Sequence, residues 1–133
     1  MAACSGYSGD RVICIGKSGK YYYRTNYSTT TSYLTGSILH LSARTKENTW
    51  IDMFSNSNSH VLEVDGLNLY NAYFGYSAAT ATWYKSQIPG NGIKTCTSGG
   101  NSTNNYCLSR DGYLYYKAYN STSWTKSNLS VKG

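Results

Sequence analysis

The sequence predicts an all-β fold built from three related units of about four short strands each. The chain of 133 residues contains 15 tyrosines and a single proline. It is also rich in Ser, Thr and Asn, a composition that favours strands over helices. One pattern recurs in residues 12–38, 61–88 and 105–129, and no segment has helical periodicity. Anchors that recur at roughly 40–50 residues indicate a repeat architecture.

Two anchors define the repeated pattern. The first is a glycine with large side chains three and four residues later. The glycines are Gly19, Gly66 and Gly112, and the pairs that follow them are Tyr22 and Tyr23, Leu69 and Tyr70, and Tyr115 and Tyr116. The second anchor is a closing aromatic residue, which is Tyr33, Trp83 or Trp124. Because glycine accepts the positive φ of tight turns, each glycine is predicted to join two strands.

The strands of the first unit follow from its apolar runs and turn residues. Residues 11–15 (RVICI) and 20–24 (KYYYR) are predicted to flank a turn at residues 17–19. A short strand is expected before them, around Ala3 and Cys4. A fourth strand is expected to begin at Tyr33 and to run toward Leu41.

The second and third units repeat this order. Residues 49–54 (TWIDMF) alternate apolar and polar side chains, as a strand does, and turns are predicted at residues 55–59 and 65–66. Residues 89–92 (PGNG) are the strongest loop signal in the chain. Residues 93–96 then form a strand and 98–105 a polar loop before the third copy. We expect one domain over residues 1–133, with units of about residues 1–44, 45–91 and 92–133.

The chain resembles the β-trefoil superfamily, both its ricin-B-like and its fibroblast-growth-factor-like members. The resemblance rests on LEVDGLNLY, CLSRDGYLYY and the closing Trp-x-x-Ser-x-Ile/Leu, and it spans the whole chain. It implies a β-trefoil with three pseudo-symmetric four-stranded units. The Gln-x-Trp signature of ricin-type repeats is absent from all three copies. The alternative architecture is a small β-propeller, completed by oligomerisation.

The chain has four cysteines in two pairs of similar spacing, Cys4 and Cys14, and Cys96 and Cys107. In each pair one cysteine lies in the strand before the copy and the other in the strand that opens it. Neighbouring antiparallel strands can bring two such residues within disulfide range, so we predict the bonds Cys4–Cys14 and Cys96–Cys107. Met53 and Leu62 are expected to take these places in the second unit. Paired cysteines favour a secreted protein, whereas free cysteines would indicate the cytosol.

The closing aromatics are predicted to fill the core, because large buried rings dominate core packing. Neighbours in a strand face opposite sides, so Leu69 suggests that Tyr23, Tyr70 and Tyr116 form the outward set. Ricin-type trefoils place a sugar-binding Asp near the glycine turn, where this chain has Asp65 and Asp111. The expected carbohydrate-binding residues are Asp65, Asn68 and Tyr70 in the second unit and Asp111, Tyr116 and Asn120 in the third.

These features predict a multivalent, non-catalytic carbohydrate-binding protein, a lectin whose partners are glycans or glycoproteins. His40 and His60 have no partner at a recognisable spacing, so no catalytic set, metal site or cofactor motif is predicted. The net charge of +6 comes from scattered basic residues, which does not favour nucleic acid. No apolar run is long enough for a membrane span, and a homo-oligomer is left open.

Two other functions are left open by the sequence. The first is a trefoil-type protease inhibitor that acts through an exposed loop at residues 43–48 or 98–105, although no proline frames either loop. The second is a heparin- or receptor-binding extracellular ligand, which the net charge of +6 suggests.

Overall fold

The computed structural model describes residues 3–7, 11–16, 21–24, 31–34, 48–53, 58–75, 82–98 and 104–131. In this part of the chain the protein is all-β and has no helix. The strands form three four-stranded antiparallel sheets, each a meander in which strands pair in chain order. Each sheet falls within one of the three units expected from the sequence.

The strands are short and follow the predicted order of strands and turns. The first sheet contains β1 (Ala3–Tyr7), β2 (Arg11–Ile15), β3 (Tyr21–Arg24) and β4 (Thr31–Leu34). The second sheet contains β5 (Asn48–Met53), β6 (Asn58–Asp65), β7 (Asn68–Gly75) and β8 (Thr82–Gln87). The third sheet contains β9 (Ile93–Ser98), β10 (Asn104–Ser109), β11 (Tyr113–Ala118) and β12 (Thr125–Ser130). β4 begins earlier than predicted, at Thr31 rather than at Tyr33, and β6 and β10 begin at Asn58 and Asn104, inside the turn predicted at residues 55–59 and the loop predicted at 98–105.

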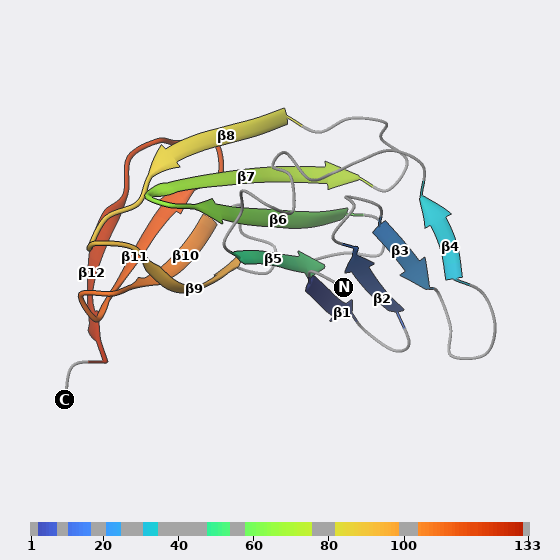
Figure 1. Cartoon of the computed structure of the whole chain (residues 1–133), viewed down its shortest axis with the longest axis horizontal. Coiled ribbons are helices and arrows are strands. Elements are labelled where there is room, and N and C mark those ends of the chain that lie inside the picture. Colours follow the sequence, from blue (N-terminus) through green and yellow to red (C-terminus); the bar gives the residue numbers. More distant parts are fainter. Residues whose placement is uncertain are drawn as a thin grey trace.

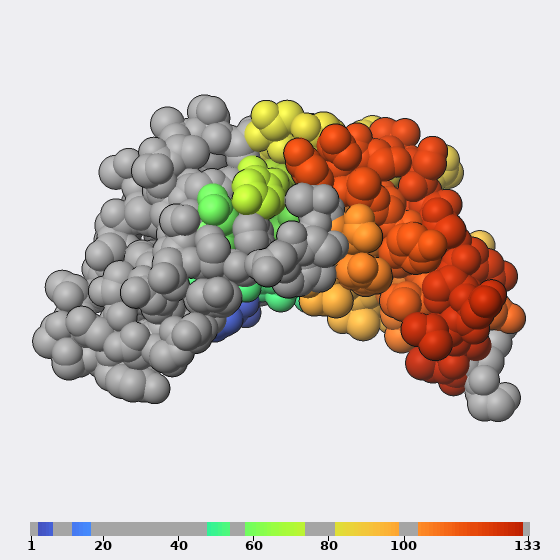
Figure 2. Space-filling view, turned by 180° about the vertical axis from the view of Figure 1, so that it is seen from behind, coloured from blue at the N-terminus to red at the C-terminus, as the bar shows by residue number. Residues whose placement is uncertain are grey.

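The three sheets are arranged as a curved row with the second sheet in the middle (Figure 1). Between the sheets, the backbone of β5 lies close to β1 and β2, and the backbone of β9 lies close to β5 and β6. The first strands β1, β5 and β9 therefore lie along the inside of the curve, and the last strands β4, β8 and β12 lie along its outside (Figure 1). In the space-filling view, β5 and β9 reach the hollow side of the molecule (Figure 2). The described sheets do not close into a barrel.

Two hydrophobic cores lie between neighbouring sheets. The first core lies between the first and second sheets and contains Ile13, Ile15, Ile51, Met53, Val61 and Ala72. The second core lies between the second and third sheets and contains Leu62, Val64, Leu69, Ile88, Ile93, Cys96 and Cys107. Trp83 packs against the first core and Trp124 against the second, each partly buried. The two tryptophans thus play equivalent roles, although they cover the cores rather than fill a barrel.

Cross-strand pairing shows which residues of the three units are equivalent. Opposite one another across the central hairpins are Cys14 and Tyr22, Glu63 and Tyr70, and Cys107 and Tyr115. The second turn is one residue shorter than the other two, since four residues separate Val64 from Leu69 and five separate Leu108 from Leu114. An alignment on the glycines is therefore shifted by one residue in the second unit.

This shift corrects the predicted outward set of tyrosines. Leu69 packs in the second core, so Tyr70 points to the opposite face of its sheet, toward the first sheet. The residue equivalent to Tyr116 is Asn71, which is buried. Tyr70 and Tyr116 therefore lie on opposite faces of their sheets and do not form one repeated surface. The predictions for the side chains of Tyr22, Tyr23 and Tyr33 lie outside the described residues.

The structure contains the disulfides Cys4–Cys14 and Cys96–Cys107, the pairs expected from the sequence. Each bond joins directly opposite residues of the first two strands of a sheet. The expectation that Met53 and Leu62 take these places in the second sheet is wrong, because Met53 lies opposite Ser59 and Leu62 lies opposite Trp50. The equivalent residues are Thr49 and Glu63, which are opposite each other and buried.

We expect the double variant Cys96→Ala/Cys107→Ala to lose about 2–3 kcal/mol of unfolding free energy, because the bond restricts the unfolded chain. Urea unfolding followed by circular dichroism measures the loss. Cys4→Ala/Cys14→Ala is the matched variant, since the sequence separations of the two bonds are 10 and 11. Its loss should be of the same size. Unchanged stability in both double variants would contradict the prediction.

Candidate functional site

A cleft of about 350 Å³ opens between the second and third sheets. It is lined by Asn48, Trp50, Val64, Ile93, Lys94 and Arg110. Val64 and Ile93 are buried and form its floor, whereas Asn48, Lys94 and Arg110 are exposed. The cleft therefore combines an indole ring, an amide and two cations above an apolar base.

Trp50 comes to the cleft from the middle of β5. It lies opposite Leu62 of β6 and packs against the second core, and it remains partly exposed. Its equivalents in the first strands of the other sheets are Ser5 and Thr97, by the pairing that makes Thr49 equivalent to the two cysteines. The tryptophan is thus a feature of one inter-sheet cleft and is not repeated three times.

Arg110 is placed by the loop of residues 89–92. The Arg110 backbone N–H donates to the Gly92 carbonyl at 2.9 Å, and the Asp111 N–H donates to the Gly90 carbonyl at 3.2 Å. A Cβ atom on Gly92 would stand 3.0 Å from the Arg110 Nε atom. The absence of a side chain at Gly92 therefore lets the guanidinium arm lie against the loop.

A smaller hollow of about 210 Å³ adjoins the cleft and shares Ile93 and Arg110 with it. Its other lining residues are Gly66, Leu67, Asn91 and Gly92. The loop of residues 89–92 and the turn between β6 and β7 are tied here, because the Ile88 N–H donates to the Leu67 carbonyl at 2.7 Å. Arg110 thus lines both hollows.

The predicted acidic residues lie near these hollows without lining them. Asp65 and Asn68 pair across the turn that holds Gly66 and Leu67, and both are partly exposed. Asp111 follows Arg110, but its carboxylate accepts from the Tyr113 N–H at 3.0 Å and from the Tyr115 hydroxyl at 2.6 Å. This hydrogen bond, together with burial, raises the pKa of Tyr115. The carboxylate of Asp111 is therefore engaged in fixing its own hairpin.

The other three predicted residues lie away from the cleft and from one another. Tyr70 lies on the opposite face of the second sheet, with the Lys85 ammonium 5.7 Å from its ring centroid. Tyr116 lies on the face of the third sheet that points away from the second sheet, beside Tyr106, with 6.2 Å between their ring centroids. Asn120 is exposed after β11. The structure does not bring these residues into one site.

Sequence reasoning missed Trp50, Lys94 and Arg110. In the sequence the two cations are scattered charges, and Trp50 is one residue of an alternating strand. The loop of residues 89–92 was the one local signal that could have found them, since its two glycines bring this loop against Arg110.

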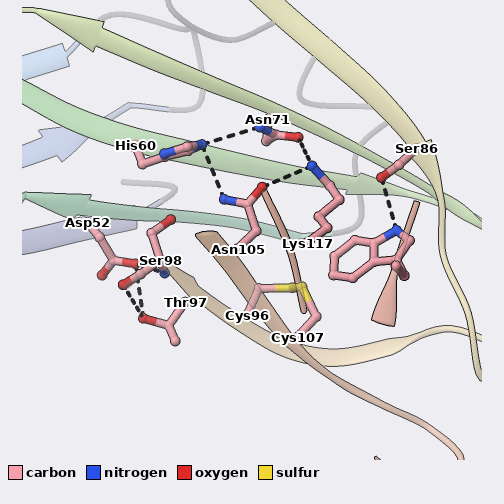
Figure 3. The surroundings of a disulfide bond; sticks show 11 residues. Asp52, His60, Asn71, Ser86, Cys96, Thr97, Ser98, Asn105, Cys107 and Lys117 are labelled. Atoms are coloured by element: carbon pink, nitrogen blue, oxygen red, sulfur yellow. Dashed lines mark hydrogen bonds between the residues drawn. A yellow bond between two sulfur atoms is a disulfide. The ribbon is translucent and has the colours of Figure 1, made fainter. Parts of the chain in front are cut away.

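A buried polar network ties the second sheet to the third beside the Cys96–Cys107 bond (Figure 3). The Lys117 ammonium donates to the Asn71 Oδ1 atom at 2.9 Å and to the Asn105 Oδ1 atom at 3.1 Å. Its third N–H is shared between the carbonyls of Ala118 and Tyr119, at 3.2 and 3.3 Å. Lys117 is 2 % exposed and both asparagines are fully buried.

The network fixes the protonation of His60. Because an ammonium can only donate, it orients both amide oxygens toward Lys117 and both amide nitrogens toward His60. The Nδ2 atoms of Asn71 and Asn105 lie 3.3 and 3.2 Å from the His60 Nε2 atom. Nε2 must therefore accept, and His60 is the neutral tautomer with its proton on Nδ1.

The pKa values of both titratable groups of the network are shifted, by burial and, for His60, also by a nearby charge. Burial, with the nearby Lys117 charge, lowers the pKa of His60 from 6.5 to about 4. Burial also lowers the pKa of Lys117 from 10.5 to about 8. His60 lies in β6 and is 1 % exposed. The network is closed to solvent and holds two sheets together, so it is not a place where a ligand binds.

Gly90 and Gly66 offer a matched test of the loop that positions Arg110. Their φ angles are +69° and +61°, but a Cβ on Gly90 would stand 2.6 Å from the Ser109 Cβ atom, while a Cβ on Gly66 would meet nothing within 4 Å. A left-handed φ costs an alanine about 1–2 kcal/mol. We expect Gly66→Ala to lose that amount of unfolding free energy in urea and Gly90→Ala to lose roughly 1 kcal/mol more, for the clash. Equal losses would show that the loop moves freely away from the hairpin.

Within the described residues, no group of three His, Cys, Asp or Glu side chains is placed to hold a metal ion. None of the described segments forms a helix long and apolar enough to cross a membrane. No protein-family model matches the chain, and no curated protein sequence matches it significantly.

Proposed function

We propose that this protein is a lectin that binds a sugar bearing a carboxylate or sulfate group in the cleft between the second and third sheets. The observation that carries the proposal is the grouping of Trp50, Lys94 and Arg110 around one cleft of about 350 Å³. This volume is at the lower end of the roughly 300–1,000 Å³ of small-molecule sites.

Each of these side chains suits one part of such a sugar. The apolar C–H face of a sugar ring packs on an indole, which offers a large flat apolar surface. A guanidinium binds carboxylate and sulfate oxygens in pairs, and an ammonium adds a second positive charge. The net charge of +6 attracts an anionic partner from a distance. An amide at Asn48 is available for hydroxyl groups.

The position of the cleft between two sheets is related to the overall architecture. A trefoil closes its strands into a barrel, whereas four-stranded meanders arranged around an axis are the blades of a propeller. The meander order of each sheet and the inward position of β1, β5 and β9 favour the propeller alternative over the trefoil expected from the sequence. Clefts between neighbouring blades follow from that arrangement.

We further propose that the protein acts outside the cell, where glycans and glycoproteins are its partners. The two disulfides are consistent with an extracellular protein. The weak affinity expected of one shallow cleft would be offset on a glycan-coated surface if the clefts of several chains bind together.

The test is a glycan array followed by calorimetry with an acidic monosaccharide, a matched neutral sugar and heparin. Arg110→Gln is expected to weaken binding of the acidic sugar at least roughly tenfold, because it removes a charge-assisted hydrogen-bond pair. Lys85→Gln is the matched control, since it removes one exposed charge on β8, away from the cleft. Trp50→Phe, which keeps an aromatic ring, should bind more weakly than wild type without losing binding.

Three outcomes would overturn the proposal. The first is equal weakening by Arg110→Gln and Lys85→Gln, which would point to net charge rather than a site. The second is binding of heparin alone that fades as salt screens charge and is unchanged in Arg110→Gln and Trp50→Phe, as for a ligand attracted by net charge. The third is the absence of any glycan binding together with inhibition of a protease. The loops expected of an inhibitor, at residues 43–48 and 98–105, lie mostly outside the described residues.

A further inference from the structure

The chain makes the same inter-sheet contact twice. Ile13 and Ile15 of β2 pack in the first core, facing the second sheet. Counted from the central hairpin, the equivalent residues of β6 are Leu62 and Val64, which pack in the second core and face the third sheet. Each sheet therefore presents one face to the sheet that follows it in the chain and the opposite face to the sheet before it.

The third sheet has a face that corresponds to the one with which the first and second sheets contact the next sheet. No described sheet packs on this face, because the third sheet is last in the row (Figure 1). The residues of β10 equivalent to Leu62 and Val64 are Tyr106 and Leu108. Leu114 and Tyr116 lie opposite them on β11. All four side chains are partly exposed, and Tyr116 is 36 % exposed. This face, defined by these four residues, is called the outer face of the third sheet.

The first sheet also has a face on which no described sheet packs. It corresponds to the face with which the third sheet contacts the second. Cys96 and Cys107 are 6 % and 1 % exposed, because their face of the third sheet packs against the second sheet. Cys4 and Cys14 occupy the same positions in the first sheet, yet Cys4 is exposed and Cys14 partly exposed. The difference follows from the order of the described sheets, since none of them packs on this face of the first sheet. This face, marked by the Cys4–Cys14 bond, is the preceding face of the first sheet.

We propose that two copies of the chain close into one ring of six sheets. The outer face of the third sheet in each copy packs on the preceding face of the first sheet in the other copy. The two faces are the two halves of a contact that the chain already makes twice internally, so a second copy fits where an unrelated partner would need new complementarity. This inference does not depend on the proposed glycan binding.

The number of copies follows from the number of sheets. A contact between two different faces generates either a closed ring or an open filament, depending on whether the rotation closes. Propellers close with about four to eight blades, and a ring made from copies of these three described sheets must contain a multiple of three sheets. Six is the multiple of three in that range. The curvature of the row, with β1, β5 and β9 on its hollow side, is the curvature that such a ring needs (Figures 1 and 2).

The mass in solution tests the ring. Sedimentation velocity should show a species of twice the 14.7 kDa chain mass. Tyr116→Glu places a charge on the outer face of the third sheet and should weaken the dimer roughly 30-fold or more, as the loss of an interface hot spot does. Leu129→Glu is the matched control, because Leu129 lies on β12 and is already 67 % exposed. It should leave the dimer intact.

The Cys4–Cys14 bond supplies a second measurement on the same variants. In the ring it is covered, so a reductant and an alkylating reagent should reach it slowly in wild type and in Leu129→Glu, and rapidly in Tyr116→Glu. Circular dichroism verifies that each variant is folded. The milder variant Leu108→Ser should act in the same direction if Tyr116→Glu does not fold.

The inference is overturned if wild type is a monomer at high concentration, because the outer face of the third sheet and the preceding face of the first sheet would then stay uncovered in solution. It is overturned equally if the chains form filaments of increasing mass. A dimer that survives both Tyr116→Glu and Leu108→Ser, with unchanged reactivity of Cys4–Cys14, would place the interface elsewhere.

Discussion

The variant Asn105→Leu is expected to lose about 3–5 kcal/mol of unfolding free energy, because it removes one hydrogen-bond partner of a buried charge. Asn105 is fully buried and joins the two titratable groups of the network. Its Oδ1 atom accepts from the Lys117 ammonium at 3.1 Å, and its Nδ2 atom lies 3.2 Å from the His60 Nε2 atom. Leucine is of similar size, so the loss reflects polarity rather than a cavity. Urea unfolding at pH 7 measures it.

Asn104→Leu is the matched control. Asn104 is the neighbouring residue of β10, but it is partly exposed and lies on the other face of the sheet. Its replacement removes no contact with the buried ammonium and should change stability by less than about 1 kcal/mol, as substitutions away from buried polar groups generally do. Similar losses in the two variants would show that the network does not hold a buried charge.

The double variant Asn105→Leu/Lys117→Met separates charge from packing. When the ammonium is absent, the leucine at position 105 no longer leaves it short of an acceptor. When apolar groups of similar volume replace a buried ionic group, the unfolding free energy often stays the same or rises. The double variant should therefore be more stable than Asn105→Leu alone, which is a non-additive result. A double variant less stable than either single one would contradict this account.

The strands, turns and disulfide pairs could be predicted because their signals are local. Alternating side chains, a glycine in a turn and two cysteines in neighbouring strands each involve residues close in the sequence. The glycine anchors found the central hairpins of the second and third units. They did not predict which face each residue occupies, because the second turn is one residue shorter and a shift of one residue reverses the face of a strand.

The candidate site depends on contacts between sheets, which no local pattern reports. Trp50 and Arg110 are sixty residues apart in the sequence and meet only because the second and third sheets pack together. The same is true of Asn71 and Lys117, which are 46 residues apart. Lys117 follows Tyr116 in an amphipathic strand and looks like a surface residue in the sequence. Its burial is explained by four acceptors that come from two different sheets and a loop.

The network also predicts two changes of stability with pH. The pKa of His60 is lowered from 6.5 to about 4 in the folded protein. Between these values the unfolded chain binds a proton that the folded protein excludes, so unfolding free energy falls as the solution is acidified from pH 6.5 to 4. The pKa of Lys117 is lowered from 10.5 to about 8. Here the unfolded chain again binds more protons, so unfolding free energy rises between pH 8 and 10.5. Each change amounts to about 3 kcal/mol.

Differences between variants isolate these two changes from the titration of other groups. The rise above pH 8 should disappear in Lys117→Met and remain in Lys126→Met, because Lys126 is exposed and its ammonium lies 3.8 Å from the Tyr113 ring centroid at the surface. The fall below pH 6.5 should be smaller in His60→Gln than in wild type, since glutamine offers an amide oxygen as acceptor and does not titrate. Urea unfolding at a single protein concentration supplies the profiles, and an NMR titration follows the imidazole directly. A His60 ring that takes up its proton near pH 6.5 while the protein stays folded would refute the closed network, because a protonated Nε2 cannot accept from the two amides that face it.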